Sequence, residues 1–455
     1  MTTAQLGEIA SIVRGIAFPK EDKRADPLPG HVACLRTTNV QRTVEWDDLW
    51  FVPDKHIKRD EQLVRSGDIL ISTANSYELV GKVAPVVGIP HKATLGAFIS
   101  LIRPNERVEP KFLYHQLAWG KTQSRIRETA STTTNISNVS TKKLLTLEIF
   151  TPPLEAQREI VAELEKKFSR LDEAVANLQR VKANLKRYKA SILKAAVEGR
   201  LVETEATLAR REGRTYETGE KLLQRVVEER RAKWAGRGKY KEPELPRIEH
   251  TFDLPKGWTW ATLGHLSLSV KDGPHYSPMY ADEGIPFISG GNVRPEGIDF
   301  TTTKYITREL HQELSKRCKP EVGDLLYTKG GTTGIARVNT DPREFNVWVH
   351  VAVLKLAEPM HRFYVQHALN SQHCYRQAQE YTHGVGNQDL GLTRMVWITV
   401  PLPPQAEQAR IVAEVDRHLS IIREVEAEVD ANLKRAQALR QSTLAKAFGI
   451  EGRQI

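Results

Sequence analysis

The chain has 455 residues, and at roughly 150 residues per domain this length predicts about three domains. Lys and Arg number 66 against 56 Asp and Glu, a formal net charge of +10, and the hydrophobic fraction of 40% excludes wholesale disorder. The three cysteines, Cys34, Cys318 and Cys374, form no C-x-x-C pair, which excludes a disulfide framework and a cysteine zinc site and fits a reducing cytosol.

The N-terminal sequence has no basic leader segment. No uncharged apolar run approaches the roughly 18 residues that a membrane span needs. We therefore expect a cytoplasmic protein without a membrane partner. The surplus of basic residues favours a polyanionic partner in a general way.

Residues 1–151 predict a β-rich domain. Short apolar runs such as DILIST and AFISLIR are separated at short intervals by Gly, Pro, Asn and Thr. This pattern is typical of mixed β structure, and a short helix is expected around KFLYHQLAW.

Residues 152–202 predict one long helix. Tandem prolines precede it, Glu155 and Glu159 lie in its first turn, and Gly199 follows its last apolar residues. Apolar side chains recur at heptad spacing and predict the seam of a coiled coil. This seam comprises Val161, Leu164, Phe168, Leu171, Val175, Leu178, Leu185 and Ile192.

Residues 203–254 join the two halves of the chain and are dominated by charge. Leu222, Leu223, Val226 and Val227 predict one amphipathic helix, followed by a Pro-rich linker. Charge runs of this kind are usually solvated faces, and we interpret them so here.

The rest of the chain repeats this plan. Residues 255–402 predict a second β-rich domain with a short helix around FYVQHALNSQ, and residues 403–455 predict a second long helix. The helix starts PPLEAQREIVAEL and PPQAEQARIVAEV lie 403 − 152 = 251 residues apart, as do SILKAAV and STLAKAF. Asn39 matches Asn292 and Asn135 matches Asn387, so one unit of about 200 residues is used twice. The seam of the second helix comprises Val412, Val415, Leu419, Ile422, Val429 and Leu433.

These elements predict an α+β fold. A helix over 155–198 would extend roughly 66 Å at about 1.5 Å per residue. We expect the two helices to pair antiparallel as a coiled coil that separates the two β-rich domains, with a pseudo-twofold internal repeat. The alternative is that each helix packs against a different protein.

No catalytic motif stands out. Gly120-Lys121-Thr122 has the tail of a phosphate-binding loop, but His115 stands where the first glycine is needed. The sequence has no H-E-x-x-H and no G-x-S-x-G, and no ligand spacing accompanies His275. We therefore expect neither catalysis nor a metal in this chain.

The sequence resembles the specificity (S) subunit of type I restriction-modification enzymes. The resemblance rests on the helix start that is used twice, on the helix ends SILKAAVEGRL and STLAKAFGIEG, on the openings LGEI at Leu6 and LGHL at Leu263, and on the segments GDILIST and GDLLYTK. It covers nearly the whole chain, and residues 203–250 are its least distinctive part.

The resemblance implies that residues 1–151 and 255–402 are target recognition domains, each reading one half of a split, asymmetric site in double-stranded DNA. The spacer helices at 152–202 and 403–455 would dock two methyltransferase (M) subunits, to which two restriction/translocase (R) subunits bind. S-adenosylmethionine, ATP and magnesium would belong to those partners, in a system of DNA modification and host defence.

Unlike loops on like scaffolds predict unlike half-sites, and hence a non-palindromic target. Arg and Lys fit guanine edges, while Asn and Gln fit adenine. In the first domain the candidate DNA-binding residues are Lys20, Lys23 and Arg24, which suit phosphates, and Arg36, Thr37, Thr38, Asn39, Ser76, Tyr77, Asn135 and Asn138. In the second they are Lys271, His275, Tyr276, Asn292, Lys329, Thr332, Arg337, Asn387 and Gln388. The alternative for each is a turn former or a solvated side chain.

Two other functions stay open at this point. A self-sufficient DNA methyltransferase or nuclease would bind S-adenosylmethionine or cleave DNA alone. A coiled-coil interaction hub without DNA binding would bind its partners in a way that salt does not weaken, whereas DNA binding falls steeply with salt.

Overall fold

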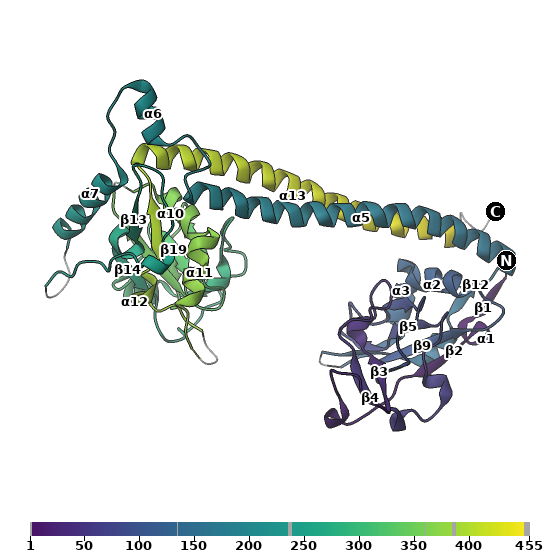
Figure 1. The fold of residues 1–455 in the computed structure, drawn as a ribbon. Helices are drawn as coiled ribbons and strands as arrows, with labels where there is room; N and C mark the ends of the chain where they lie inside the picture. The colour runs from purple at the N-terminus through teal and green to yellow at the C-terminus, as the bar shows by residue number, and fades with distance from the viewer. Residues whose placement is uncertain (1, 134, 235–238, 359, 385–387, 450–455) are drawn as a thin grey trace. The chain divides into compact units, whose positions relative to one another are not determined.

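The computed structural model describes residues 2–133, 135–234, 239–358, 360–384 and 388–449. The chain divides into two compact units, Met1–Gln179 with Val429–Ile455 and Arg180–Glu428. Each unit contains one β-rich domain and a part of each of two long helices, α5 (Leu154–Val197) and α13 (Gln405–Phe448) (Figure 1).

The first domain consists of short strands and a few helices, as its sequence predicts. The helix expected around KFLYHQLAW is confirmed as α2. The elements are β1 (Thr3–Gln5), α1 (Leu6–Ile9), β2 (Ala10–Arg14), β3 (His31–Leu35), β4 (Trp50–Pro53), β5 (Ile69–Ser72), β6 (Ala74–Asn75), β7 (Val83–Pro85), β8 (Ala93–Leu95), β9 (Ile99–Pro104), α2 (Pro110–Ala118), α3 (Gly120–Glu128), β10 (Ala130–Thr132), β11 (Ser137–Val139), α4 (Thr141–Leu145) and β12 (Glu148–Phe150).

A four-stranded antiparallel sheet in the order β2-β9-β5-β7 forms the centre of this domain. Because side chains alternate across a strand, Ile69 and Ile71 of β5 face a core that includes Phe112 of α2. Leu70 faces the other way, into a core with Leu95 of β8. The second core lies against a three-stranded sheet, β4-β3-β8, in which β3 and β8 are parallel. The central sheet is therefore buried on both faces.

The second domain has the same plan. Its elements are β13 (Thr259–Thr262), α8 (Leu263–Leu266), β14 (Ser267–Asp272), β15 (Ile285–Ile288), β16 (Val293–Arg294), β17 (Gly297–Ile298), β18 (Lys304–Ile306), α9 (Arg308–Ser315), β19 (Leu325–Thr328), β20 (Ala336–Val338), β21 (Asn346–Val347), β22 (Val351–Leu356), α10 (Arg362–Leu369), α11 (Gln372–Glu380), α12 (Leu392–Met395) and β23 (Thr399–Leu402). The short helix expected around FYVQHALNSQ is confirmed as α10.

The repeat seen in the sequence extends to the sheet topology. The order β14-β22-β19-β20 corresponds to β2-β9-β5-β7, and β18-β15-β21 corresponds to β4-β3-β8 with the same parallel pair. Leu325 and Tyr327 face the core that includes α10, while Leu326 faces the second sheet. The domains differ in small additions: the sheet β10-β11-β6 belongs to the first, and the pair β16-β17 and helix α9 belong to the second.

A matched glycine shows how closely the backbones agree. Gly15 follows β2 and Gly273 follows β14. A Cβ atom on Gly15 would lie 2.2 Å from the carbonyl oxygen of Gly96, and one on Gly273 would lie 1.7 Å from that of Val347. Both positions need glycine because the chain that leaves β2 or β14 passes directly over the backbone at the end of the parallel strand β8 or β21.

The two long helices pair antiparallel within each unit. In the first, Phe168 near the start of α5 shares a core with Phe448 at the end of α13. In the second, Ile192 near the end of α5 shares a core with Val412 near the start of α13. The predicted antiparallel pairing is therefore confirmed.

All fourteen predicted seam residues are buried or half-buried. We expected the two seams to pack on each other. They also pack on the β domains, because their ends belong to the cores of those domains. Val161, Leu164 and Phe168 pack with the first domain, and Ile192, Val412 and Val415 pack with the second.

The repeated glutamine of the helix start explains how each long helix is fixed to its domain. Gln157 is fully buried; its side chain accepts the backbone N–H of Glu109, the N-cap of α2, at 2.9 Å and donates to the carbonyl of Pro152 at 2.7 Å. Gln408, 251 positions later, does the same with the N–H of His361, the N-cap of α10, and the carbonyl of Pro403.

A histidine–carboxylate contact is repeated about two turns farther along each long helix. His115 of α2 contacts Glu165 of α5 at 3.0 Å, and His367 of α10 contacts Asp416 of α13 at 3.0 Å. The two acidic residues are again 251 positions apart, so the attachment of helix to domain is repeated in both halves of the chain.

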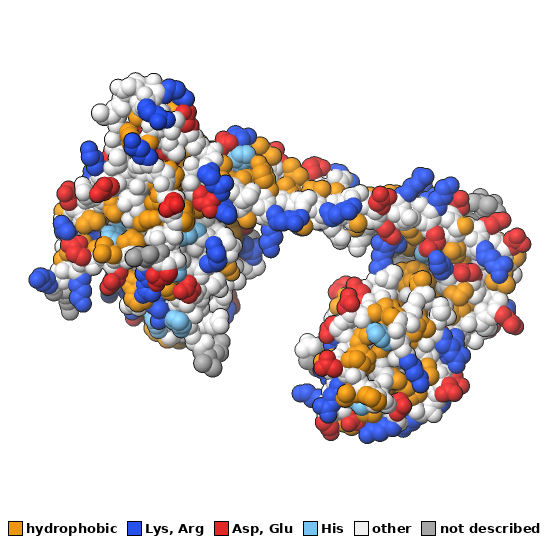
Figure 2. Space-filling view, viewed as in Figure 1, with side chains coloured by type: hydrophobic (Ala, Val, Ile, Leu, Met, Phe, Trp, Pro, Cys, Tyr) orange, Lys and Arg blue, Asp and Glu red, His pale blue; other side chains and the backbone are white. Residues whose placement is uncertain are grey.

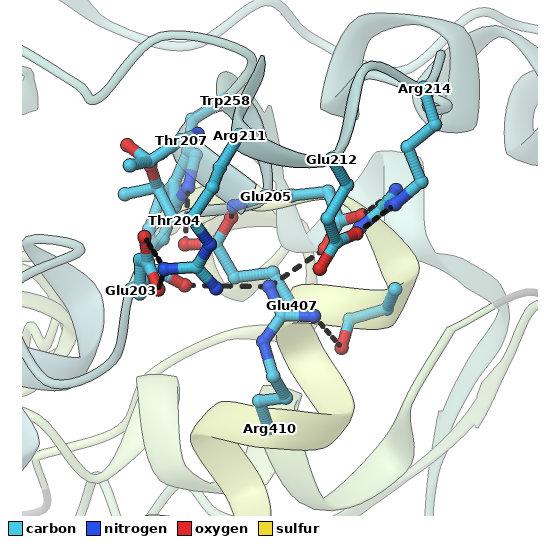
Figure 3. Close-up of polar contacts among 11 residues, drawn as sticks. Glu203, Thr204, Glu205, Thr207, Arg211, Glu212, Arg214, Trp258, Glu407 and Arg410 are labelled. Carbon is cyan, nitrogen blue, oxygen red and sulfur yellow. Dashed lines mark hydrogen bonds and ion pairs between the residues drawn. The ribbon is translucent and has the colours of Figure 1, made fainter. Parts of the chain in front are cut away.

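The join contains two helices where the sequence predicted one. The predicted amphipathic helix is α7 (Gly219–Ala232), with Leu222 and Val226 fully buried, and it is confirmed. The other helix, α6 (Glu205–Glu212), was not predicted because distant residues hold it. Glu407 accepts hydrogen bonds from the Trp258 indole at 3.0 Å and the Glu205 backbone N–H at 2.8 Å (Figure 3).

The carboxylate of Glu205 completes this cluster. It pairs with Arg214 at 2.5 Å and with Arg410 at 2.7 Å, and its side chain is only 3% exposed (Figure 3). Burial raises the pKa of Glu205, but the hydrogen bonds from the two guanidinium groups outweigh it, so the pKa lies below its ordinary value of 4.5. The neighbouring Glu203 pairs with Arg211 but is 40% exposed.

We expect Glu205→Ala to detach α6, because Arg410 loses this ion pair and Arg214 keeps its ion pair with Glu212 alone of the two; the cost should be about 1–3 kcal/mol. Glu203→Ala, the matched control, should cost less than about 1 kcal/mol. Urea denaturation and hydrogen exchange of the α6 amides measure both. Because the folded pKa of Glu205 is lowered, its contribution is present above pH 4.5 and lost as the pH falls, so the difference from wild type should shrink in acid. A difference that grows in acid would contradict this role.

Candidate nucleic-acid interface

A groove of about 560 Å³ in the first domain brings together five of the predicted DNA-binding residues. It is bounded by the segments that follow β2, β3 and β8 and by β4, with Phe18, Trp50 and Phe98 among its apolar walls. The predicted residues that line it are Lys20, Lys23, Arg36, Thr37 and Thr38. Residues far apart in sequence thus form one surface that carries positive charge and aromatic rings.

Trp50 organises the cations of this groove. The Lys23 ammonium lies 3.5 Å from the centre of the indole ring, and the Arg36 guanidinium lies 4.4 Å from it. Cation–π contacts of this kind hold flexible side chains in place without neutralising their charge. Arg36 also donates to the carboxylate of Asp48 at 2.5 Å, while its Nε–H is buried and has no hydrogen-bond partner among the described residues.

The remaining candidates of the first domain surround a neighbouring hairpin. Ser76 and Tyr77 follow β6, Asn138 lies on β11 opposite Ala74, and Asn135 lies between β10 and β11; all four candidates are exposed. The Ala74 N–H donates to the carbonyl of Phe98 at 3.1 Å, which connects the hairpin to the groove. Arg24 is exposed and pairs through its backbone with Phe51.

Asn39 and Asn292 are turn formers, which corrects their assignment as base readers. Asn39 is 2% exposed; its side chain accepts the Arg36 N–H at 2.8 Å and donates to the carbonyls of Glu45 and Asp47. Asn292 is 5% exposed and holds the equivalent turn through the Ser289 N–H and the Asp299 carbonyl. Their amide donors are used inside the protein, so neither is free to contact a base edge.

The second domain has a group of charges at the corresponding edge, with Asp272 and Lys329 buried at its centre. Lys329, which follows β19, pairs with Asp389 at 2.7 Å and with Asp272 at 3.6 Å. Asp272, the last residue of β14, also pairs with Arg317 at 2.8 Å and His275 at 3.3 Å. We call these five residues the charge hub.

Lys329 is therefore not a direct DNA contact, which corrects its assignment. Its side chain is 2% exposed and its ammonium is enclosed by two carboxylates. Burial of an amino group needs such partners, because an unpaired charge in the interior is costly.

The hub gathers most of the other candidates of the second domain. Lys271, His275 and Tyr276 are exposed next to Asp272, and Gln388 is exposed next to Asp389. Thr332 is exposed in the turn after Lys329. Asn387 lies outside the described residues.

Arg337 is half-buried on β20 and donates to the carbonyl of Pro295 at 3.1 Å, apart from the hub contacts. Burial lowers the pKa of Arg337, and the nearby Arg423 lowers it further.

The surface charge is mixed. On the face drawn in Figure 2, Lys and Arg side chains are interspersed with Asp and Glu over both domains and form no continuous basic patch. The described part of the chain contains no group of three or more His, Cys, Asp or Glu that could hold a metal ion. None of its described helices is both long and apolar enough to cross a membrane.

The two halves of the chain match one family model. The model of the type I restriction modification DNA specificity domain matches residues 1–187 and again residues 255–435. The chain belongs to this family. The match falls on both β-rich domains and much of both long helices, and it confirms the resemblance drawn from the repeated motifs.

Relatives of known name agree with this assignment to the type I specificity subunits. The chain is 23% identical over 459 residues to the type I restriction enzyme EcoKI specificity subunit of Escherichia coli strain K12, covering 98% of this chain and 88% of that protein. The StySPI specificity subunit of Salmonella potsdam is 23% identical over 457 residues, with the same coverage.

A solved structure from a study of complex assembly and conformational transition of the type I R-M system has a TM-score of 0.61 at 19% identity. It covers 98% of this chain and 97% of that chain. This likeness concerns the fold.

Several residues of these surfaces were not found by sequence reasoning. Trp50 and Phe98 carry the aromatic part of the groove, and Asp272 and Asp389 carry the acidic part of the hub. One available signal was the replacement of VRG by VKDG at matched positions, which adds an acidic residue just before the required glycine.

Asn39→Ala should destabilise the first domain by about 1–3 kcal/mol, because the turn loses the three hydrogen bonds that the buried Asn39 side chain makes to backbone groups. Asn135→Ala, at an exposed position of the same domain, should change stability by no more than about 0.5 kcal/mol. Urea unfolding of the full chain measures both. Equal stabilities would show that Asn39 does not support its turn.

Proposed function

We propose that this chain is the non-catalytic DNA-reading subunit of a type I restriction-modification complex. Each β-rich domain reads one half of a bipartite, asymmetric site in double-stranded DNA. The two long helices dock two methyltransferase subunits, to which two restriction subunits bind. S-adenosylmethionine, ATP and magnesium then belong to these partners.

One observation carries the proposal: the same scaffold occurs twice, with different chemistry at the edge where the candidate readers gather. The backbone positions of Phe98 and His350 correspond, since their carbonyls accept the N–H of the residue that follows β5 and β19, respectively. Phe98 is 61% exposed beside the cationic groove, whereas His350 is half-buried and packs on Trp348. Two scaffolds that differ in this way suit two different half-sites.

The long helices carry features that suit partner docking. Large apolar side chains remain exposed on both of them, although each seam is covered. These side chains are Val181, Tyr188, Ile421, Val425 and Leu439. Exposed apolar groups on a helix favour contact with another protein rather than with DNA phosphates.

The central experiment is co-expression of the chain with the methyltransferase subunit of its own system, followed by genome-wide mapping of modified adenines. We expect a single motif with two unlike halves and a fixed gap. A continuous or palindromic motif, or an unchanged methylome, would contradict the proposal. Binding of S-adenosylmethionine or cleavage of DNA by the purified chain would instead support a self-sufficient enzyme. Partner binding without DNA affinity would support an interaction hub.

Lys20 lines the groove, is exposed and suits a phosphate contact. In the complex with methyltransferase subunits, Lys20→Ala should weaken DNA binding about equally for all sequences. It should lower the slope of log K against log salt by about 1. The matched control is Lys92→Ala, at an exposed lysine that does not line the groove. Titrations at several salt concentrations measure the slopes, and equal slopes for both variants would exclude Lys20 as a phosphate contact.

A further inference from the structure

We infer that the charge hub is a positioning device for the second domain, and that Lys329 and Asp389 determine how faithfully this domain reads its half-site. The inference rests on the proposed function. It assigns Lys329, which cannot reach DNA itself, a role in DNA reading through the segments that it holds.

The hub joins four segments that are distant in sequence. Asp272 ends β14, Arg317 follows α9, Lys329 follows β19, and Asp389 lies before α12. Asp272 is also 2% exposed, so the Asp272–Lys329 pair lies in the interior. Exposed candidate readers continue directly from two of these segments, at His275 and at Gln388.

Lys329 holds the segment of Asp389 with its backbone as well as its side chain. The Leu390 N–H donates to the Lys329 carbonyl at 2.7 Å, and Gly330 forms an isolated bridge with Asp389. Arg394 donates to the Asp389 carbonyl at 3.0 Å. The position of Asp389 is thus fixed by contacts of its backbone as well as by the ion pair of its carboxylate.

The first domain holds the matching segment without buried charge. Its Val139 N–H donates to the Thr73 carbonyl at 2.9 Å, so Thr73 corresponds to Lys329 and Asn138 to Asp389. There the segment belongs to the three-stranded sheet β10-β11-β6. In the second domain the described residues of the segment form only isolated bridges, from Asp389 to Gly330 and His383. In the second domain the charges of the hub hold this segment in place, as the hydrogen bonds between strands do in the first domain.

The hub also sets the charge next to the reading edge. The Asp389 side chain is 41% exposed and would repel DNA phosphates if it were unpaired. The buried Lys329 ammonium neutralises the charge of the Asp389 carboxylate. Loss of either residue should therefore disturb the position of Gln388 and the electrostatics around it, and leave the groove of the first domain untouched.

The test uses the full chain co-expressed with its methyltransferase subunit and maps modified adenines. Asp389→Ala should fold, because position 389 is half-exposed and Lys329 keeps its ion pair with Asp272. The variant should relax the sequence preference of one half of the motif by about tenfold or more, which is the effect of losing a hydrogen bond between charged groups. Lys329→Met should relax the same half, and the other half should keep its sequence. Asp282→Ala, at an exposed aspartate of the same domain, should leave the motif unchanged.

A double variant separates positioning from stability. Lys329→Met with Asp389→Asn removes both charges of the shorter pair, so thermal unfolding should return toward wild type relative to Lys329→Met alone, while the half-site stays relaxed. A wild-type motif in the double variant, or an unchanged motif in Asp389→Ala, would overturn the inference. A change with Asp389→Ala but not with Lys329→Met would make Asp389 a direct reader and would also overturn it. If the wild-type chain gives no bipartite motif, the proposed function fails, and this outcome is distinct from a bipartite motif that ignores the hub.

Discussion

Burial of the apolar stripe on each long helix is the constraint on which the other features depend. A helix of 44 residues with one apolar face is not stable alone in water, since helical stability in proteins comes mainly from packing of that face. Here the ends of each stripe enter the core of a β domain, and the start of one helix meets the end of the other within each unit. Each β domain is consequently completed by both helices, including the one that lies far from it in sequence.

This constraint explains which parts of the repeat are kept and which differ. Gln157 and Gln408 bind the backbone at the starts of α2 and α10. These hydrogen bonds fix the position of each long helix relative to its domain. The same holds for the acidic partners of His115 and His367. In the described part of the chain, the segments that follow the strands at the opposite edge make no such contacts with the helices. There the first domain has an aromatic and cationic groove, and the second has the charge hub.

The extent to which the sequence predicted the structure follows from the same distinction. The long helices, their seams and the internal repeat depend on local spacing and on repetition, and these are visible in the chain. Asn39 and Lys329 have residue types that suit DNA, and only the fold shows that their polar atoms are used internally. Helix α6 is short, and its partners Glu407 and Trp258 follow it at distances that no local pattern connects. Long-range polar contacts were therefore the part that the sequence could not predict.

A scaffold with a fixed attachment and free edges suits a protein that has to change what it reads without changing how it assembles. A substitution at Gln157 or Gln408 disturbs a helix cap and a core together, so few residues fit there. A substitution among exposed residues such as Lys20 or Gln388 disturbs little inside the domain. The charge hub lies between these extremes, because Asp272 and Lys329 are buried while Asp389 is half-exposed. A substitution at such a position alters the stability of the domain and the surface next to Gln388 together.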